Sequence, residues 1–240
     1  MQIYDALAII LLAALVHASF QLSVSLLTLL NSHAIGRQSS HMTVLKLTGS
    51  FVLGVVVMTT LALCTTAWVV ANTIGKDIPE IVWAAACGLM LGIGVAIWAF
   101  YYRKEPGTTL WLPRSFARYL MDRTKLTSHA AEAFGLGMSS VIAETFFIAA
   151  PMIAAALVLT RLEPLEQLLG VFMYVGVSAL SLMSVVLLVG SGHRISSIQK
   201  WREENKTFIQ FTAGCALLIL GIYVYIDQVL GSGTVIAGGL

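Results

Sequence analysis

Long apolar runs separated by shorter polar segments occupy most of this 240-residue chain. A helix needs about 20 apolar residues to cross a hydrocarbon layer of ~30 Å. The alternation of apolar and polar residues that is typical of a transmembrane β-strand is absent, and helices are the other structure that satisfies every backbone group in lipid. The pattern therefore predicts six transmembrane helices, at Ala6–Leu30, Val44–Val70, Ile81–Tyr101, Ala130–Leu159, Leu165–Val189 and Phe208–Leu230.

The composition supports an integral membrane protein of the all-α class. Hydrophobic residues make up 58% of the chain and charged residues only 11%, whereas about 25% of the residues of a soluble domain are charged. The lipid bilayer is therefore the expected partner of most of the surface. Each of the three cysteines falls inside a predicted helix, which favours packing residues over disulfides.

The distribution of positive charge predicts the orientation of the chain. Twelve of the 14 Lys and Arg residues fall in the first, third and fifth connections between the predicted helices or, in the case of Lys46, at the adjoining helix end. By the positive-inside rule these loops are cytoplasmic, so both termini lie outside, and the size and short loops suggest a prokaryotic plasma (inner) membrane. No Lys or Arg precedes the first helix, which we therefore expect to be retained and not cleaved as a signal peptide. The positive-inside rule accounts for the basic loops, and the net charge is only +2, so nucleic-acid binding is not expected.

The longest connection, 102–129, divides the chain into two three-helix halves, 1–101 and 130–240. The halves resemble each other: GVVVMTTLA (54–62) matches GVSALSLMS (176–184), and LGIGVAIW (91–98) matches LGIYVYID (220–227) at an offset of 129. Because three is an odd number of crossings, the second copy must enter the membrane from the opposite side. We therefore expect an inverted 3+3 repeat, an architecture of many secondary transporters. The alternative is that apolar helices look alike by composition.

The segment 102–129 contains a short amphipathic pattern at helical spacing. One side carries apolar and aromatic residues, and the other carries arginines that would lie near anionic headgroups. The pattern predicts a cytoplasmic helix on the inner leaflet, with a plain solvated linker as the alternative. The apolar side consists of Trp111, Phe116, Tyr119 and Leu120, and the basic side of Arg114, Arg118 and Arg123.

Two ionisable side chains fall near the middle of predicted helices, His17 in the first and Glu144 in the fourth. A charge at this depth costs about 2.5–3.5 kcal/mol on insertion scales, so such residues normally face the bundle interior and are paired. His17 is the obvious partner for Glu144. Two interpretations follow: a substrate or proton site, or a structural hydrogen bond that holds the first helix to the fourth.

The helix faces around these two residues are small or polar, as expected of tight packing or a cavity lining. His17 shares its side of the helix with Ala14, Gln21, Ser25 and Thr28, and Glu144 shares its side with Ala133, Gly137, Ser140, Pro151 and Ala155. Pro151 lacks an N–H and frees a carbonyl near Phe147, so we expect it to act as a hinge. The predicted binding residues are His17, Gln21, Thr59, Ser140, Glu144, Thr145 and Ser181.

The 3+3 arrangement with candidate residues in the first and fourth helices resembles the superfamily that includes amino-acid exporters of the LysE type and disulfide-reductant conduits of the CcdA/DsbD type. CcdA-like proteins carry a cysteine in each of these two helices. This chain has none there, which excludes electron transfer through a thiol pair. The resemblance implies a transporter, and an acid in the fourth helix is shared with its cation-transporting branch.

The leading hypothesis is a transporter for a small solute or ion, with a midplane site between the first and fourth helices and proton coupling through Glu144 as an option. A membrane assembly or scaffold subunit is the alternative. An intramembrane enzyme with His17 as base and Ser139 or Ser140 as nucleophile lacks a recognisable motif, so no enzyme is predicted. Neither a cofactor nor a metal site is predicted, because the remaining histidines lack metal-ligand spacing. A homo-oligomer is kept as an alternative to a monomer.

Overall fold

The structure is a computed structural model that describes residues 3–20, 24–30, 41–101, 114–191, 200–201 and 204–231. In this part of the chain every regular element is a helix, which confirms the all-α prediction. Side chains on the outward faces of the long helices are apolar, for example Leu53, Ile142 and Phe172, each of which is more than half exposed. Such a surface fits lipid and not water, so the chain is membrane-embedded.

Four helices are long and apolar enough to cross a membrane by themselves. They are α3 (His41–Thr73), α4 (Glu80–Ala96) with the π-helical η1 (Ile97–Tyr101), α6 (Ala130–Leu159), and α10 (Lys206–Val224) with the π-helical η2 (Tyr225–Leu230). Two bent helix pairs also qualify if each is taken as one span. The described residues therefore contain four spans, or up to six.

The bent pairs are the main departure from the predicted helices. In the first, α1 (Ile3–Ser19) is inclined by 44° to the helical residues Val24–Leu30, and in the second, α7 (Pro164–Ser178) is inclined by 46° to α8 (Leu180–Gly190). The hydropathy pattern predicted one continuous helix in each place, Ala6–Leu30 and Leu165–Val189.

A serine hydroxyl bonded to an earlier carbonyl lies next to each bend. The Ser19 hydroxyl donates to the Val16 carbonyl at 2.6 Å, and the Ser178 hydroxyl donates to the Val175 carbonyl at 3.0 Å. Hydrogen bonds of this kind compete with the backbone ladder and bend helices. At Pro151, where a hinge was predicted, α6 continues as one helix.

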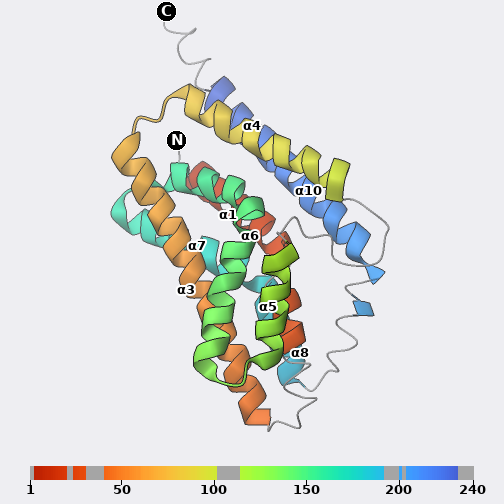
Figure 1. Cartoon of the computed structure of the whole chain (residues 1–240). Coiled ribbons are helices and arrows are strands. Elements are labelled where there is room, and N and C mark those ends of the chain that lie inside the picture. The colour runs from red at the N-terminus through yellow and green to blue at the C-terminus, as the bar shows by residue number, and fades with distance from the viewer. Residues whose placement is uncertain are drawn as a thin grey trace, which may run out of the picture.

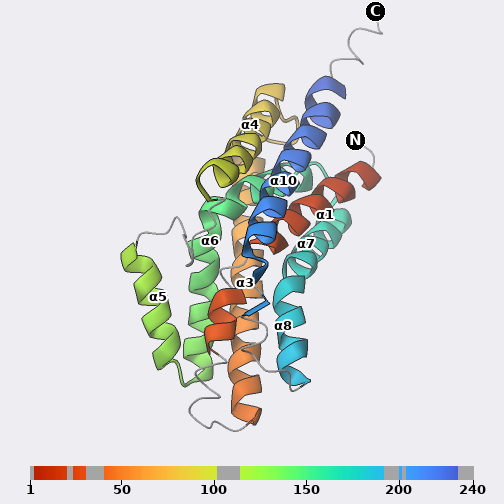
Figure 2. The same ribbon diagram turned by 90° about the vertical axis from the view of Figure 1, so that its right-hand side faces the viewer.

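The central helix of the fold is α6, which packs against α1, α3, α4, α7 and α10. Its closest neighbour is α3, which lies beside it and runs in the same direction (Figures 1 and 2). Two glycines make this approach possible. A Cβ on Gly54 would collide with the Phe134 carbonyl, and a Cβ on Gly137 would collide with the Phe51 carbonyl. The two backbones therefore touch at reciprocal positions, a spacing that small residues allow in membranes.

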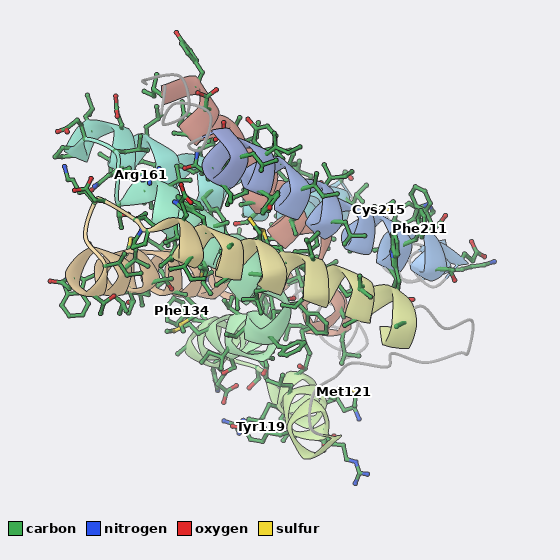
Figure 3. All side chains as sticks on the ribbon, turned by 90° about the horizontal axis from the view of Figure 1, so that it is seen from above. Tyr119, Met121, Phe134, Arg161, Phe211 and Cys215 are labelled. Atoms are coloured by element: carbon green, nitrogen blue, oxygen red, sulfur yellow. The ribbon has the colours of Figure 1, made fainter. Side chains whose placement is uncertain are left out.

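The antiparallel pair α4 and α10 lies side by side along one flank of the molecule (Figures 1 and 3). Near one end of this pair, the Trp98 ring stacks on Phe211 with ring centroids 5.4 Å apart, and its indole N–H donates to the Phe211 carbonyl. The pair reaches the rest of the fold through contacts of α4 with α6 and of α10 with α1.

The predicted helix in the long connection is present as α5 (Arg114–Leu126). It lies alongside the first half of α6 and does not cross it (Figure 2). Leu120 is buried, whereas Tyr119, predicted on the same apolar side, is 54% exposed. Trp111 lies outside the described residues, and the side chain of Phe116 is likewise not described. The expected position on the inner leaflet stays a prediction.

Arg161, in the turn between α6 and α7, connects several elements at one end of the molecule (Figure 3). Its guanidinium donates to the Gln228 side chain at 2.7 Å and to the Ile78 carbonyl at 3.5 Å, and it lies 5.2 Å from the centre of the Trp83 ring. Burial lowers the pKa of Arg161, while Asp77 and Asp227 act in the opposite direction. These contacts join the α3–α4 and α6–α7 connections to α4 and η2.

Candidate functional site

A small cavity lies where the two bent pairs meet α3 and α6. Residues from both sides of each bend line it, together with residues from the middle of α3 and α6. Its volume of about 10 Å³ is roughly that of one water-sized sphere. The polar side chains of the lining are His17, Thr59, Glu144, Ser178 and Ser181.

The cavity unites four of the seven binding residues predicted from the sequence, which are His17, Thr59, Glu144 and Ser181. They come from four different elements: α1, α3, α6 and α8. Their separation along the chain shows that the fold, and not local sequence, assembles the group. The structure thereby places His17 and Glu144 on one cavity, as the hypothesis of a shared site requires.

The hydrogen-bond partner of His17 is Tyr174 of α7, a residue that the sequence analysis did not select. The Tyr174 hydroxyl lies 3.1 Å from Nδ1 of His17, and the two rings are 5.6 Å apart between centroids. Tyr174 is completely buried. A tyrosine within an apolar helix usually serves packing. Its position one turn before Ser178, on the same side of α7, is the signal that could have found it.

Glu144 is buried on the side of α6 that the sequence predicted to be internal. Every member of the face expected to accompany it is also buried: Ala133, Gly137, Ser140, Pro151 and Ala155. Beside it, Phe147 stacks on Phe20 with ring centroids 5.4 Å apart. Phe20 lines the cavity, so this aromatic pair forms part of the wall next to the carboxylate.

Three predicted binding residues are not part of the cavity lining. Ser140 is buried one turn below Glu144, where its hydroxyl donates to the Gly137 carbonyl at 2.7 Å. Thr145 is exposed, and its hydroxyl donates to the Val141 carbonyl at 3.2 Å. Gln21 lies outside the described residues. The serine nucleophiles considered with His17 also differ in position, because Ser139 donates to the Gly135 carbonyl, away from this cavity.

Replacing Tyr174 with phenylalanine removes the hydrogen bond to His17 and leaves the apolar packing almost unchanged. We expect a loss of about 1 kcal/mol in the free energy of unfolding, because the buried imidazole nitrogen loses its partner. Chemical denaturation of the purified protein in detergent measures this difference. Tyr4→Phe is the matched control, since Tyr4 is 78% exposed. Equal stability of the two variants would show that the Tyr174 hydroxyl contributes nothing.

Comparison with protein-family models, with curated proteins and with solved structures finds no match for this chain.

Proposed function

We propose that this protein transports a small solute or ion across the membrane through the cavity at the two helix bends. The observation that carries the proposal is the gathering of Glu144, His17, Thr59 and Ser181 around one cavity deep in an otherwise apolar bundle. Polar and ionisable groups at such depth are costly, and they mark substrate or ion pathways by default. Interrupted helices at a midplane site are a further feature of transporters.

In this proposal, transport proceeds by alternating access. The bends at Ser19 and Ser178 let the halves of each bent pair change their inclination, which opens the cavity first to one side of the membrane and then to the other. Arg161 and its partners close the end of the molecule at which α6 and α7 connect. Opening toward that end requires these contacts to separate.

The proposed topology is six spans in an inverted 3+3 repeat, with both termini outside the plasma membrane and a distant relationship to the LysE type of exporter. The two π-helical segments support the repeat, since η1 and η2 fall within one residue of equivalent positions at the offset of 129. The bends do not match the repeat. They occur in the first and fifth spans, whereas the repeat makes the first span equivalent to the fourth.

The test is a flux assay in liposomes containing the purified full-length chain. The probes are radiolabelled sodium and rubidium, a labelled amino-acid mixture and a dye that reports internal pH. We expect the wild-type protein to accelerate the flux of at least one probe and Glu144→Gln to reduce that flux at least about tenfold, because the variant removes the buried charge.

Glu132→Gln is the matched control on the same helix. Glu132 is exposed at the start of α6, where its carboxylate accepts hydrogen bonds from the Ser128 and His129 backbone amides, and glutamine can replace it in this role. This variant should transport like the wild type. A fully active Glu144→Gln would contradict the proposal. A stable wild type that moves no probe, together with a tolerated Glu144→Gln, would favour a scaffold subunit instead.

A further inference from the structure

Two hydroxyl groups of the cavity lining differ from three threonine hydroxyls of α3. Thr48, Thr60 and Thr66 each donate to the carbonyl one turn earlier in α3. Among the described residues, the Thr59 and Ser181 hydroxyls have no hydrogen-bond partner, although Thr59 is only 2% exposed. Because both side chains line the cavity, their hydroxyls are available to whatever occupies it.

The size of the cavity restricts what can occupy it. About 10 Å³ accommodates one water-sized particle. Even the smallest amino acid is several times larger, so an organic solute does not fit between the bends in this conformation. A dehydrated ion does.

The charges and donor atoms of the lining restrict the occupant further. Among the described lining residues, Glu144 is the one carboxylate, and Thr59 and Ser181 add neutral oxygen ligands. Oxygen ligands suit hard cations, and the carboxylate repels anions. One carboxylate balances one positive charge, whereas a divalent ion would keep an unbalanced charge in a low-dielectric site. Within the described part of the chain, no group of three or more His, Cys, Asp or Glu side chains is placed to hold a metal ion together.

We propose that the cavity between the two bends binds one dehydrated alkali cation, coordinated by the Glu144 carboxylate and the Thr59 and Ser181 hydroxyls. This inference rests on the transport site proposed above and specifies its ligand. The bound cation is the transported ion itself or the ion that drives transport of a larger solute.

The test measures cation binding directly in the purified full-length protein. Sodium, potassium and lithium chloride are titrated against choline chloride at constant ionic strength, with calorimetry and the melting temperature as readouts. We expect at least one alkali cation to bind and to raise the melting temperature above that in choline. Thr59→Val keeps the shape of the side chain and removes the hydroxyl, so it should weaken cation affinity at least about tenfold.

Thr60→Val is the matched control, because the Thr60 hydroxyl is satisfied by the Val56 carbonyl and is not part of the cavity lining. It should bind the cation like the wild type. Ser181→Ala should weaken binding in the same direction as Thr59→Val. The proposal is overturned if no alkali cation acts differently from choline. In that case a proton on Glu144 is sufficient to neutralise the buried carboxylate. The proposal is also overturned if Thr59→Val and Thr60→Val have the same affinity.

The flux assay separates this inference from the proposed function. Glu144-dependent flux of any probe without alkali-cation binding would refute the cation site and leave the transporter standing. Cation binding that depends on Thr59, in a protein that moves no probe, would refute transport and identify the cavity as a structural ion site.

Discussion

Gly137→Ala is expected to lower the free energy of unfolding by at least about 3 kcal/mol, the upper end of the usual cost of overpacking a core. The added methyl group would collide with the Phe51 carbonyl oxygen of α3 and would lie 3.0 Å from its carbonyl carbon and 3.1 Å from the Val55 nitrogen. These are backbone atoms, so relief requires one whole helix to move. Gly54→Ala should behave alike, because its methyl group would meet the Phe134 carbonyl.

Each of these variants has a matched control on its own helix. Among the described residues, a Cβ added to Gly135 of α6 or to Gly49 of α3 would meet no atom within 4 Å beyond its chain neighbours and its own helix backbone. Gly135→Ala and Gly49→Ala should be neutral or should stabilise by up to about 1 kcal/mol, because alanine favours the helix. Thermal unfolding in detergent provides the measurement. If Gly137→Ala melts at the same temperature as Gly135→Ala, the close α3–α6 crossing is wrong.

Arg161→Ala is the second substitution with a large expected effect, about 2 kcal/mol of destabilisation. It removes a charged hydrogen bond to Gln228 and a cation–π contact with Trp83, and such contacts contribute about 1.5–3 and 0.5–2 kcal/mol respectively. The negative charges of Asp77 and Asp227 would also lose their neighbouring cation. Partial exposure of Arg161 to solvent keeps the total near the lower end of these values.

Two further variants distinguish geometry from charge at this end of the molecule. Arg161→Lys keeps the charge but not the planar group that lies over Trp83, so an intermediate loss is expected. Lys76→Ala removes an ion pair with Glu163, 3.8 Å long and exposed on both sides, and should cost less than about 0.5 kcal/mol. Chemical denaturation compares the three variants. An Arg161→Ala variant as stable as Lys76→Ala would contradict the proposed role of this cluster.

Hydropathy alone predicted the positions of the long helices, because lipid requires a long apolar helix wherever the chain crosses. The predicted Ala130–Leu159 coincides with α6, and the predicted Ile81–Tyr101 matches α4 with η1. The bends were not predicted. Many serines in helices donate to an earlier carbonyl, as Ser139 and Ser184 do without a bend, so this local pattern does not reveal which helix will bend.

The candidate site was predicted in part. The depth of a residue in the membrane can be counted along a helix, whereas the direction in which its side chain points relative to the cavity depends on how the helices pack. Thr145 is next to Glu144 in depth, but one residue rotates the side chain by about 100° around the helix, away from the cavity. Tyr174 was missed because its hydrogen-bond partner lies far from it in the sequence. Its partner, His17, is 157 residues away, and only the packing of α1 against α7 makes it part of the site.

The reciprocal contact of α3 with α6 also determines which parts of the molecule can move. Backbone touches backbone at two points, so sliding or separating these helices would break the crossing at both. Thr59 and Glu144 are carried by this pair, whereas His17 and Ser181 are carried by the bent spans. One side of the cavity is therefore held by the α3–α6 crossing, and the other side is formed by the bent spans. In a transport cycle, α3 and α6 would serve as the pivot, and the cargo would be released from the side that this crossing holds.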